Sequence, residues 1–418
     1  MMRRSRQIVH DLGPGLVTGA ADDDPSGIGT YAVAGAGFGY ALLWLAPVAL
    51  PLVAAVQFTC ARVGLVGGMG LAAILRRHYP RWLLYPAVAL LFIANTVNAG
   101  ADIGAIAAAI DLLAPLPVPV GVLVVPIALL LFALQALGSY RLLAQVFKWT
   151  TLVLFAYVGA GILARPDWGE VLHATLIPSF RFDRDWLATV VALLGTTISP
   201  YLFFWQTTQE VEEETHLGRI DEASRRGATR GELRVAMIDT DVGMLLAVVV
   251  MYFAMLATGA TLHQTGQTEV TSAAAAAEAL RPLAGDAASL LFAVGLIGTG
   301  VLAVPILTGS AAYAIAEAFG WKSGLDEGPR TAPGFYAVTA AAMVAGLGIE
   351  FIGIDPITAL YWAAVLNGVL APPLLILILL AANNSAVMGE QRNGWRLNLL
   401  GGVTAVVMSA AAIGLLLT

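Results

Sequence analysis

The sequence predicts an all-α integral membrane protein with eleven transmembrane helices, of which the first and the sixth are broken. Composition is the first observation, because 58% of the 418 residues are hydrophobic and only 12% are charged. Soluble domains have about 25% charged residues, so this chain cannot cover a water-facing surface. The second observation is a series of apolar blocks, each near the ~20 residues that cross a bilayer. The third is a polar, proline-containing interruption inside two of these blocks.

The apolar blocks follow one another along the whole chain, and no segment between them resembles a soluble domain. Short stretches that carry most of the charges and turn-forming residues separate the blocks and predict the loops. The single cysteine, Cys60, lies within a block, so no disulfide framework is expected. We expect the spans at residues 13–38, 40–63, 83–113, 119–139, 142–164, 187–209, 235–260, 286–318, 332–350, 356–382 and 395–417.

Basic residues predict the orientation in the membrane. Arg3, Arg4 and Arg6 precede the first span, and arginines gather again in the loops after the second and sixth spans. Cytoplasmic loops carry the excess of Lys and Arg, so residues 1–12 are expected in the cytoplasm and the C-terminus outside. We expect no cleavable signal peptide. The Ala- and Gly-rich composition suggests a prokaryotic inner membrane.

The first span is interrupted at "GAADDDPSGIGTY", residues 19–31. Acids in a membrane helix cost several kcal/mol each unless they face a polar cavity or a bound ion, and this stretch carries three, Asp22, Asp23 and Asp24. Pro25 lacks an amide hydrogen and clashes with the preceding turn, so the helix is expected to break there. Broken backbone at membrane depth is tolerated where it lines a cavity. We therefore expect two half-helices with a polar site between them.

A second interruption, "GTTISPYLFFWQ" at residues 195–206, lies in the sixth span. Breaks in the first and sixth spans are the pattern of two inverted repeats of five helices, which is typical of secondary transporters. The first repeat would cover residues 13–165 and the second residues 187–382, followed by an eleventh helix at 395–418. This arrangement predicts a carrier that works by alternating access.

Other classes of function have less support in the sequence. No histidine falls within a predicted span and no His-Glu-x-x-His motif occurs, so an intramembrane enzyme is not expected. A nucleic-acid partner is not expected either, because there is no exposed basic domain. The expected partners are a small inorganic ion and the lipid bilayer, with no bound cofactor.

Several stretches resemble the Nramp (natural resistance-associated macrophage protein) family of proton-coupled divalent-metal transporters. "GPGLVTGAADDDPSG" is similar to the family's first span, which carries Asp-Pro-Gly-Asn, and "MIDTDVGML" is similar to the start of its seventh span. "LLWLAPVALPLVAAVQFTCARVGLVGG" and "ITALYWAAVLNGVLAPPLLILILLAANNSAVMGEQRNGWRLNLLGG" resemble its second span and its C-terminal part. The resemblance implies a LeuT-type fold and a protein that can work as a monomer.

The binding motifs of the family are altered in this chain. Asp24 keeps the acid of the first motif, but Gly27 stands where the family has Asn. The family's Met-Pro-His run in the sixth span corresponds to Ser199, Pro200 and Tyr201. A later family histidine falls on Gln206, and only Asp102 remains of two acids in the third span. Since borderline metals gain selectivity from sulfur and nitrogen ligands, the usual transition-metal chemistry is not expected here.

Two substrates fit the remaining residues. In one interpretation the cargo is a hard divalent cation, Mg²⁺ or Mn²⁺, held by Asp24 and its acidic neighbours with oxygens of Thr196, Thr197 and Ser199. In the other, which we favour at this stage, it is a small oxyanion such as bicarbonate coupled to Na⁺ or H⁺. Free amides at the start of a half-helix suit an anion. The candidate substrate-binding residues are Asp24, Ser26, Gly27, Gly29, Thr30, Thr196, Thr197, Ser199 and Tyr201, and the candidate coupling-ion residues are Asp22, Asp23, Asp24, Asp102 and Thr299.

Overall fold

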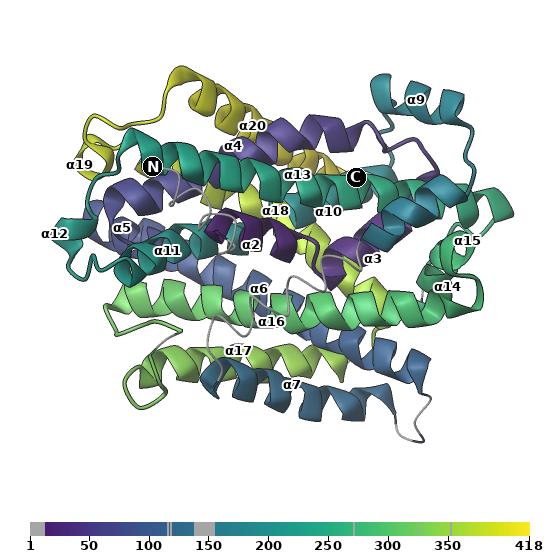
Figure 1. Cartoon of the computed structure of the whole chain (residues 1–418), viewed down its shortest axis with the longest axis horizontal. Coiled ribbons are helices and arrows are strands. Elements are labelled where there is room, and N and C mark those ends of the chain that lie inside the picture. The colour runs from purple at the N-terminus through teal and green to yellow at the C-terminus, as the bar shows by residue number, and fades with distance from the viewer. Residues whose placement is uncertain are drawn as a thin grey trace, which may run out of the picture.

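The computed structural model describes residues 13–114, 117, 119–137, 155–270, 272–325, 327–351 and 353–418. Within these ranges every regular element is a helix, and most of the long helices run side by side (Figure 1). The helices are α2 (Pro14–Asp22), α3 (Pro25–Phe38), α4 (Leu45–Gly67), α5 (Leu71–His78), α6 (Arg81–Leu113), α7 (Val120–Leu137), α9 (Trp168–Leu176), α10 (Arg184–Thr197), α11 (Pro200–His216), α12 (Glu222–Arg225), α13 (Arg230–Thr261), α14 (Ala273–Ala277), α15 (Arg281–Ala284), α16 (Ala288–Phe319), α17 (Pro333–Glu350), α18 (Pro356–Asn383), α19 (Ser385–Met388) and α20 (Trp395–Leu417).

The all-α membrane fold predicted from composition is confirmed. Among the described residues, seven spans are long and apolar enough to cross a membrane, and α10 and α11 count together as one of them. Two further apolar helices are shorter, and they correspond to α7 and α17. The predicted fifth span, 142–164, lies partly outside the described residues, and its described part is helical over 155–163. The arginines of residues 1–12, which carry part of the orientation argument, also lie outside them.

Both predicted breaks are present. The first break consists of Asp23 and Asp24, which separate α2 from α3, and Pro25 occupies the first position of α3. The second break consists of Ile198 and Ser199, which separate α10 from α11, and Pro200 opens α11. Proline is well tolerated at the first position of a helix, because the amide hydrogen that it lacks would have no partner there. Each proline therefore starts a half-helix.

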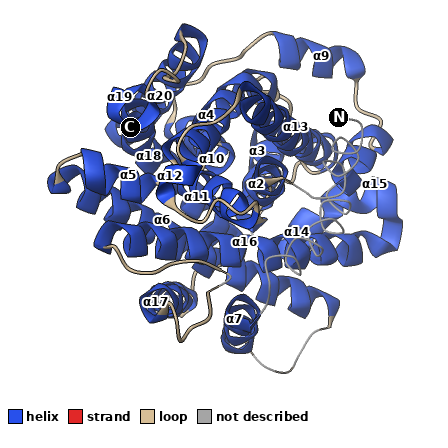
Figure 2. Ribbon diagram, turned by 60° about the vertical axis from the view of Figure 1, so that its left-hand side comes forward, coloured by secondary structure: helices blue, strands red, loops and turns tan. Residues whose placement is uncertain are grey.

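Glycines let the broken helices pack closely against their neighbours. A Cβ on Gly19 of α2 would stand 2.3 Å from the backbone of Gly243 in α13, and a Cβ on Gly195 of α10 would stand 2.2 Å from the backbone of Gly368 in α18. Asp239 of α13 also accepts a 2.7 Å hydrogen bond from the Gly15 amide near the start of α2. In Figure 2, α2, α3, α10 and α11 lie in the middle of the bundle, while α7, α17 and α20 lie at its edge.

Candidate ion-binding site at the two helix breaks

The two breaks face one another and are joined by hydrogen bonds. The hydroxyl of Tyr201, in the first turn of α11, donates a 2.7 Å bond to the carbonyl of Ala21 at the end of α2. Across the same gap, the hydroxyls of Ser26 and Thr196 lie 3.5 Å apart. Polar groups from all four half-helices therefore meet in one small region in the interior of the protein.

Asp24 is the N-cap of α3 and its carboxylate is well satisfied by the protein. Its Oδ1 accepts bonds from the Ser26 hydroxyl at 2.6 Å and from the Gly27 amide at 2.7 Å. Its Oδ2 accepts a 2.8 Å bond from the side-chain amide of Asn98 on α6. An aspartate at this position satisfies an otherwise unpaired amide at the start of a helix. Asp24 therefore holds α3 and α6 together at the first break.

Three neighbouring acids have open carboxylate oxygens. Both oxygens of Asp22, both of Asp102 and one of Asp23 are buried without a hydrogen-bond partner among the described residues. Asp102 lies one helical turn beyond Asn98 on α6, close enough to Asp24 for the two carboxyls to interact. A buried carboxylate without a partner is costly, so these oxygens require a cation, a proton or water. These unpaired carboxylate oxygens suit a positively charged ligand.

Most of the hydroxyls predicted to bind substrate donate hydrogen bonds to backbone carbonyls of the protein. Ser199 donates to the carbonyls of Gly195 at 2.8 Å and Thr196 at 2.6 Å, and so satisfies the end of α10. The Thr197 hydroxyl bonds the Leu193 carbonyl at 2.8 Å. Thr30 is different, because its hydroxyl is buried and has no partner in the described part of the chain. Of these three side chains, Thr30 is the one whose hydroxyl is open to a ligand.

The expectation that the amides at the start of α3 are free is wrong for Gly27, because its amide is bound to Asp24 as described above. The amide of Ile28 bonds the carbonyl of Asp24 at 3.1 Å as part of the helix. Gly29 does not face the gap, since a Cβ on it would meet the side chain of Leu360 on α18 at 3.2 Å. The start of α3 therefore lacks the row of open donors that the oxyanion interpretation requires.

The predicted coupling residue Thr299 lies on α16 at the level of the first break. The next residue along, Gly300, approaches Pro25, since a Cβ there would stand 3.3 Å from the proline ring. The Thr299 hydroxyl itself donates to the Leu296 carbonyl of its own helix at 3.3 Å. The structure thus places Thr299 near the break, with its hydroxyl engaged within α16.

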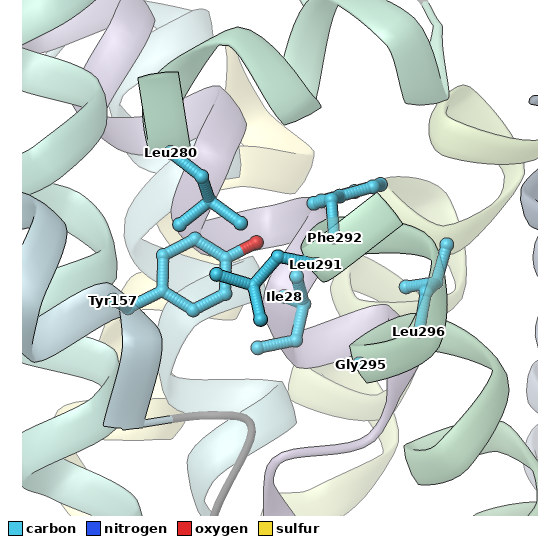
Figure 3. Close-up of a pocket in the computed structure, with 7 residues that line it drawn as sticks. All are labelled: Ile28, Tyr157, Leu280, Leu291, Phe292, Gly295 and Leu296. Atoms are coloured by element: carbon cyan, nitrogen blue, oxygen red, sulfur yellow. The ribbon is translucent and has the colours of Figure 1, made fainter. Parts of the chain in front are cut away.

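No group of three or more His, Cys, Asp or Glu side chains in the described residues is placed to hold a metal ion. A cation at the breaks would therefore need neutral oxygens or water beside the carboxylates. The nearby pocket in Figure 3 does not suit a cation, because its lining is mostly apolar and contains no acid. It lies beside the first turn of α3 and is lined by Ile28, Tyr157, Leu280, Leu291, Phe292, Gly295 and Leu296.

Comparison with known proteins decides the family. The model of the Nramp family, described as natural resistance-associated macrophage protein-like, matches residues 15–418. The chain belongs to the Nramp family. A divalent metal cation transporter, MntH, of Deinococcus radiodurans is 26% identical over 413 residues, which are 98% of this chain and 89% of that protein. MntH of Brucella suis is 28% identical over 301 residues, which are 71% of this chain but only 64% of the relative.

Solved structures confirm the LeuT-type architecture of this Nramp-family protein. A manganese transporter of Eremococcus coleocola superposes with a TM-score of 0.74 at 19% identity, over 96% of this chain and 85% of that one. Mhp1, a nucleobase-cation-symport-1 family transporter in a closed conformation, superposes with a TM-score of 0.59 at 16% identity, over 97% and 91% of the two chains. Both likenesses concern the fold.

Sequence reasoning about this Nramp-family member missed two side chains at the breaks. Tyr31 is fully buried in α3, and its hydroxyl has no hydrogen-bond partner within the described ranges. Met251 of α13 brings a thioether to the end of α10, where its sulfur accepts a 3.5 Å hydrogen bond from the Thr197 hydroxyl. The prediction that sulfur and nitrogen ligands are lost considered only the two broken spans. Met251 could not be found that way, because it comes from a third helix.

Proposed function

We propose that this protein is a secondary active transporter of a hard divalent metal cation, Mn²⁺ or Mg²⁺. The open oxygens of Asp22, Asp23 and Asp102 at the facing breaks are the observation that carries this proposal. Hard cations prefer oxygen ligands, and Mg²⁺ in particular keeps several of its waters when bound. The relatives that are named divalent metal cation transporters and the structure of a manganese transporter support the same class of cargo.

The cation proposal replaces the oxyanion that the sequence favoured. The Gly27 amide, which was to bind an anion, is bound to Asp24. Asp22, Asp23 and Asp24 are close enough for their charges to interact, and together they would repel an anion. A divalent cation instead offsets the negative charge that the first break concentrates. The same geometry that disfavours bicarbonate therefore favours a metal ion.

In this proposal the residues at the breaks have distinct roles. Asp22, Asp23 and Asp24 supply negative charge, and Thr30 offers an open hydroxyl. Asp102 on α6 and Thr299 on α16 are our candidates for the residues that bind a coupling H⁺ or Na⁺. The remaining predicted residues hold the half-helices in position through hydrogen bonds or close packing within the protein. These residues are Ser26, Gly27, Gly29, Thr196, Thr197, Ser199 and Tyr201.

The wider organisation that we propose follows from the same fold. Residues 13–165 and 187–382 would form the two inverted repeats, and residues 395–418 the additional helix. The protein would work as a monomer in a prokaryotic inner membrane. Its N-terminus would lie in the cytoplasm and its C-terminus outside, because the arginine-rich loops lie at the end of the bundle that carries α5 and α12 (Figure 1).

Uptake into proteoliposomes tests this function. The purified full-length protein is reconstituted, and uptake of Mn²⁺, Mg²⁺ and bicarbonate is measured with and without an inward H⁺ or Na⁺ gradient. We expect saturable Mn²⁺ or Mg²⁺ uptake that Asp22→Asn strongly reduces. Gradient-driven bicarbonate uptake without any divalent-cation flux would contradict the proposal, and protein-free liposomes provide the background.

A further inference from the structure

The hydroxyl of Tyr31 lies in the space that Gly27 leaves open. A Cβ on Gly27 would meet Thr196 Oγ1 at 3.2 Å, the Asp22 carbonyl oxygen at 3.3 Å and Tyr31 Oη at 3.3 Å. Tyr31 follows Gly27 by one helical turn, so both residues lie on the same face of α3. Three oxygens from α2, α3 and α10 therefore surround the position where the Nramp motif carries an asparagine side chain.

This hydroxyl is directed toward the acids of the first break. Tyr31 is completely buried, and its charge interactions are strongest with Asp23 and then with Asp22. Its oxygen lies near the Asp23 carboxyl and the Thr197 hydroxyl, but makes no hydrogen bond of standard geometry to another described residue. Buried hydroxyls in folded proteins nearly always have a partner, so a hydroxyl beside open carboxylates is placed to bond to one of them or to a water molecule at the break.

Asp24 and Asp22 differ in what they can still offer to a cation. The carboxylate of Asp24 already accepts three hydrogen bonds from Ser26, Gly27 and Asn98. Asp22 has both oxygens open and Asp23 has one. Among the three acids of the first break, the free oxygens thus belong to Asp22 and Asp23, next to Tyr31, and Asp102 adds two more from α6.

We propose that Tyr31 is a cation-binding residue of this transporter, in the place of the asparagine that the chain lacks. Its hydroxyl accepts a hydrogen bond from a water molecule of the cation, while Asp22 and Asp23 supply the carboxylate oxygens. Asp24 contributes charge and caps α3. This inference rests on the proposed divalent-cation transport and names the side chains that hold the cargo.

Water-mediated contact fits the chemistry of the site. The described residues offer no group of three acidic, histidine or cysteine ligands, so neutral oxygens and retained water molecules would complete the shell of a bound cation. Gly27 adds no side chain among these oxygens, and the phenol oxygen offers that water a fixed acceptor. A hard ion with tightly held water gains from this arrangement more than a soft ion does.

Calorimetric titration of Mn²⁺ into purified full-length protein in detergent tests the inference without a transport assay. We expect Tyr31→Phe to weaken Mn²⁺ binding about three- to tenfold, the effect of one lost hydrogen bond. Asp22→Asn, which removes a charged partner, is expected to weaken it about ten- to a hundredfold. Asp24→Asn is expected to have a smaller effect than Asp22→Asn, because asparagine also caps a helix well.

Tyr157→Phe is the matched control. It removes another buried hydroxyl that has no partner among the described residues, but this one lines the apolar pocket of Figure 3. We expect Mn²⁺ affinity to stay at the wild-type value in this variant. Equal losses in Tyr31→Phe and Tyr157→Phe would mean that buried hydroxyls act through stability alone, and would overturn the inference.

Gly27→Ala keeps the inference testable if Tyr31→Phe folds poorly, and Gly27→Asn combined with Tyr31→Phe extends the test if that variant folds. Gly27→Ala introduces a Cβ among the three oxygens and is expected to weaken Mn²⁺ binding. In the Tyr31→Phe background, Gly27→Asn is expected to restore part of the affinity, because its amide oxygen enters the vacated space. Wild-type affinity in both Tyr31→Phe and Gly27→Ala would overturn the role of Tyr31 while leaving metal transport intact. If the wild-type protein bound no divalent cation, the proposed function itself would be wrong, and this inference with it.

Discussion

The hydroxyl of Tyr201 donates a 2.7 Å hydrogen bond to the carbonyl of Ala21, and this bond joins the second break to the first. The last carbonyls of a helix have no partner within it, so Tyr201 supplies one for the end of α2. On its other side, the Tyr201 carbonyl accepts a 2.8 Å bond from the Ser310 hydroxyl on α16. The residue that replaces the family's histidine therefore fixes the relative position of the half-helices.

Removal of this bond is expected to loosen the two breaks. Tyr201→Phe leaves the Ala21 carbonyl buried without its partner, which costs about 1–3 kcal/mol. We expect a lower unfolding temperature in detergent and a reduced maximal rate of Mn²⁺ uptake. An unchanged unfolding temperature would show that the bond does not hold the half-helices together.

Asn98 is expected to matter more for stability than its neighbour Asn95 on the same helix. Asn98 donates to the carboxylate of Asp24 at 2.8 Å, while Asn95 donates to the Leu307 carbonyl at 2.8 Å. Hydrogen bonds to charged groups contribute about 1.5–3 kcal/mol, against about 0.5–1.5 kcal/mol for neutral ones. Thermal unfolding of Asn98→Ala and Asn95→Ala compares the two directly, and a larger loss in Asn95→Ala would contradict the assigned charge on Asp24.

The close approach of α2 and α13 predicts that a substitution of Gly19 strongly lowers the stability of the protein. A Cβ on Gly19 would stand 2.3 Å from the Gly243 backbone, so Gly19→Ala has to push the two helices apart, at a cost of about 1–3 kcal/mol. Gly402 of α20 is the matched control, because nothing lies within 4 Å of its added Cβ. We expect Gly402→Ala to leave the unfolding temperature unchanged or raise it slightly. Equal unfolding temperatures for the two variants would show that the crossing is not tightly packed.

Met251 tests whether sulfur contributes to ion selectivity. Its thioether is bonded to Thr197 at 3.5 Å, so in our account it supports the end of α10 and does not contact the cargo. Leucine has a similar volume, and we expect Met251→Leu to keep Mn²⁺ and Mg²⁺ affinity within about twofold. Calorimetry with Cd²⁺ provides the contrast, because a soft ion loses affinity selectively if the sulfur reaches it. A selective loss of Cd²⁺ binding would show that Met251 is a ligand.

The sequence was sufficient to predict the helices and both breaks, because length, hydropathy and proline position act locally. Pro25 and Pro200 each begin a half-helix, as their missing amide hydrogens require. The resemblance to the Nramp family also predicted the architecture correctly. These features depend on a residue and its neighbours in the chain.

The choice of substrate could not be made from the sequence alone, because it depends on contacts between distant residues. Whether the Gly27 amide is free is decided by the rotamer of Asp24, and whether Asp24 has open oxygens is decided by Asn98 on another helix. Tyr31 ends the first interrupted stretch, but its position in the chain does not show that its hydroxyl lies beside the acids, and Met251 comes from a third helix. The prediction of an oxyanion was thus made from the residues of the first break without the contacts that the fold gives them.

Anomalous X-ray diffraction from Mn²⁺-soaked crystals of the full-length protein tests the central claim most directly, which is that the facing breaks hold a divalent cation. Our account predicts an anomalous peak between the first and second breaks, nearer to Asp22 and Tyr31 than to the backbone of α11, and its loss in Asp22→Asn. Crystals that hold Mn²⁺ only elsewhere, or density for a bound oxyanion at the start of α3, would contradict it.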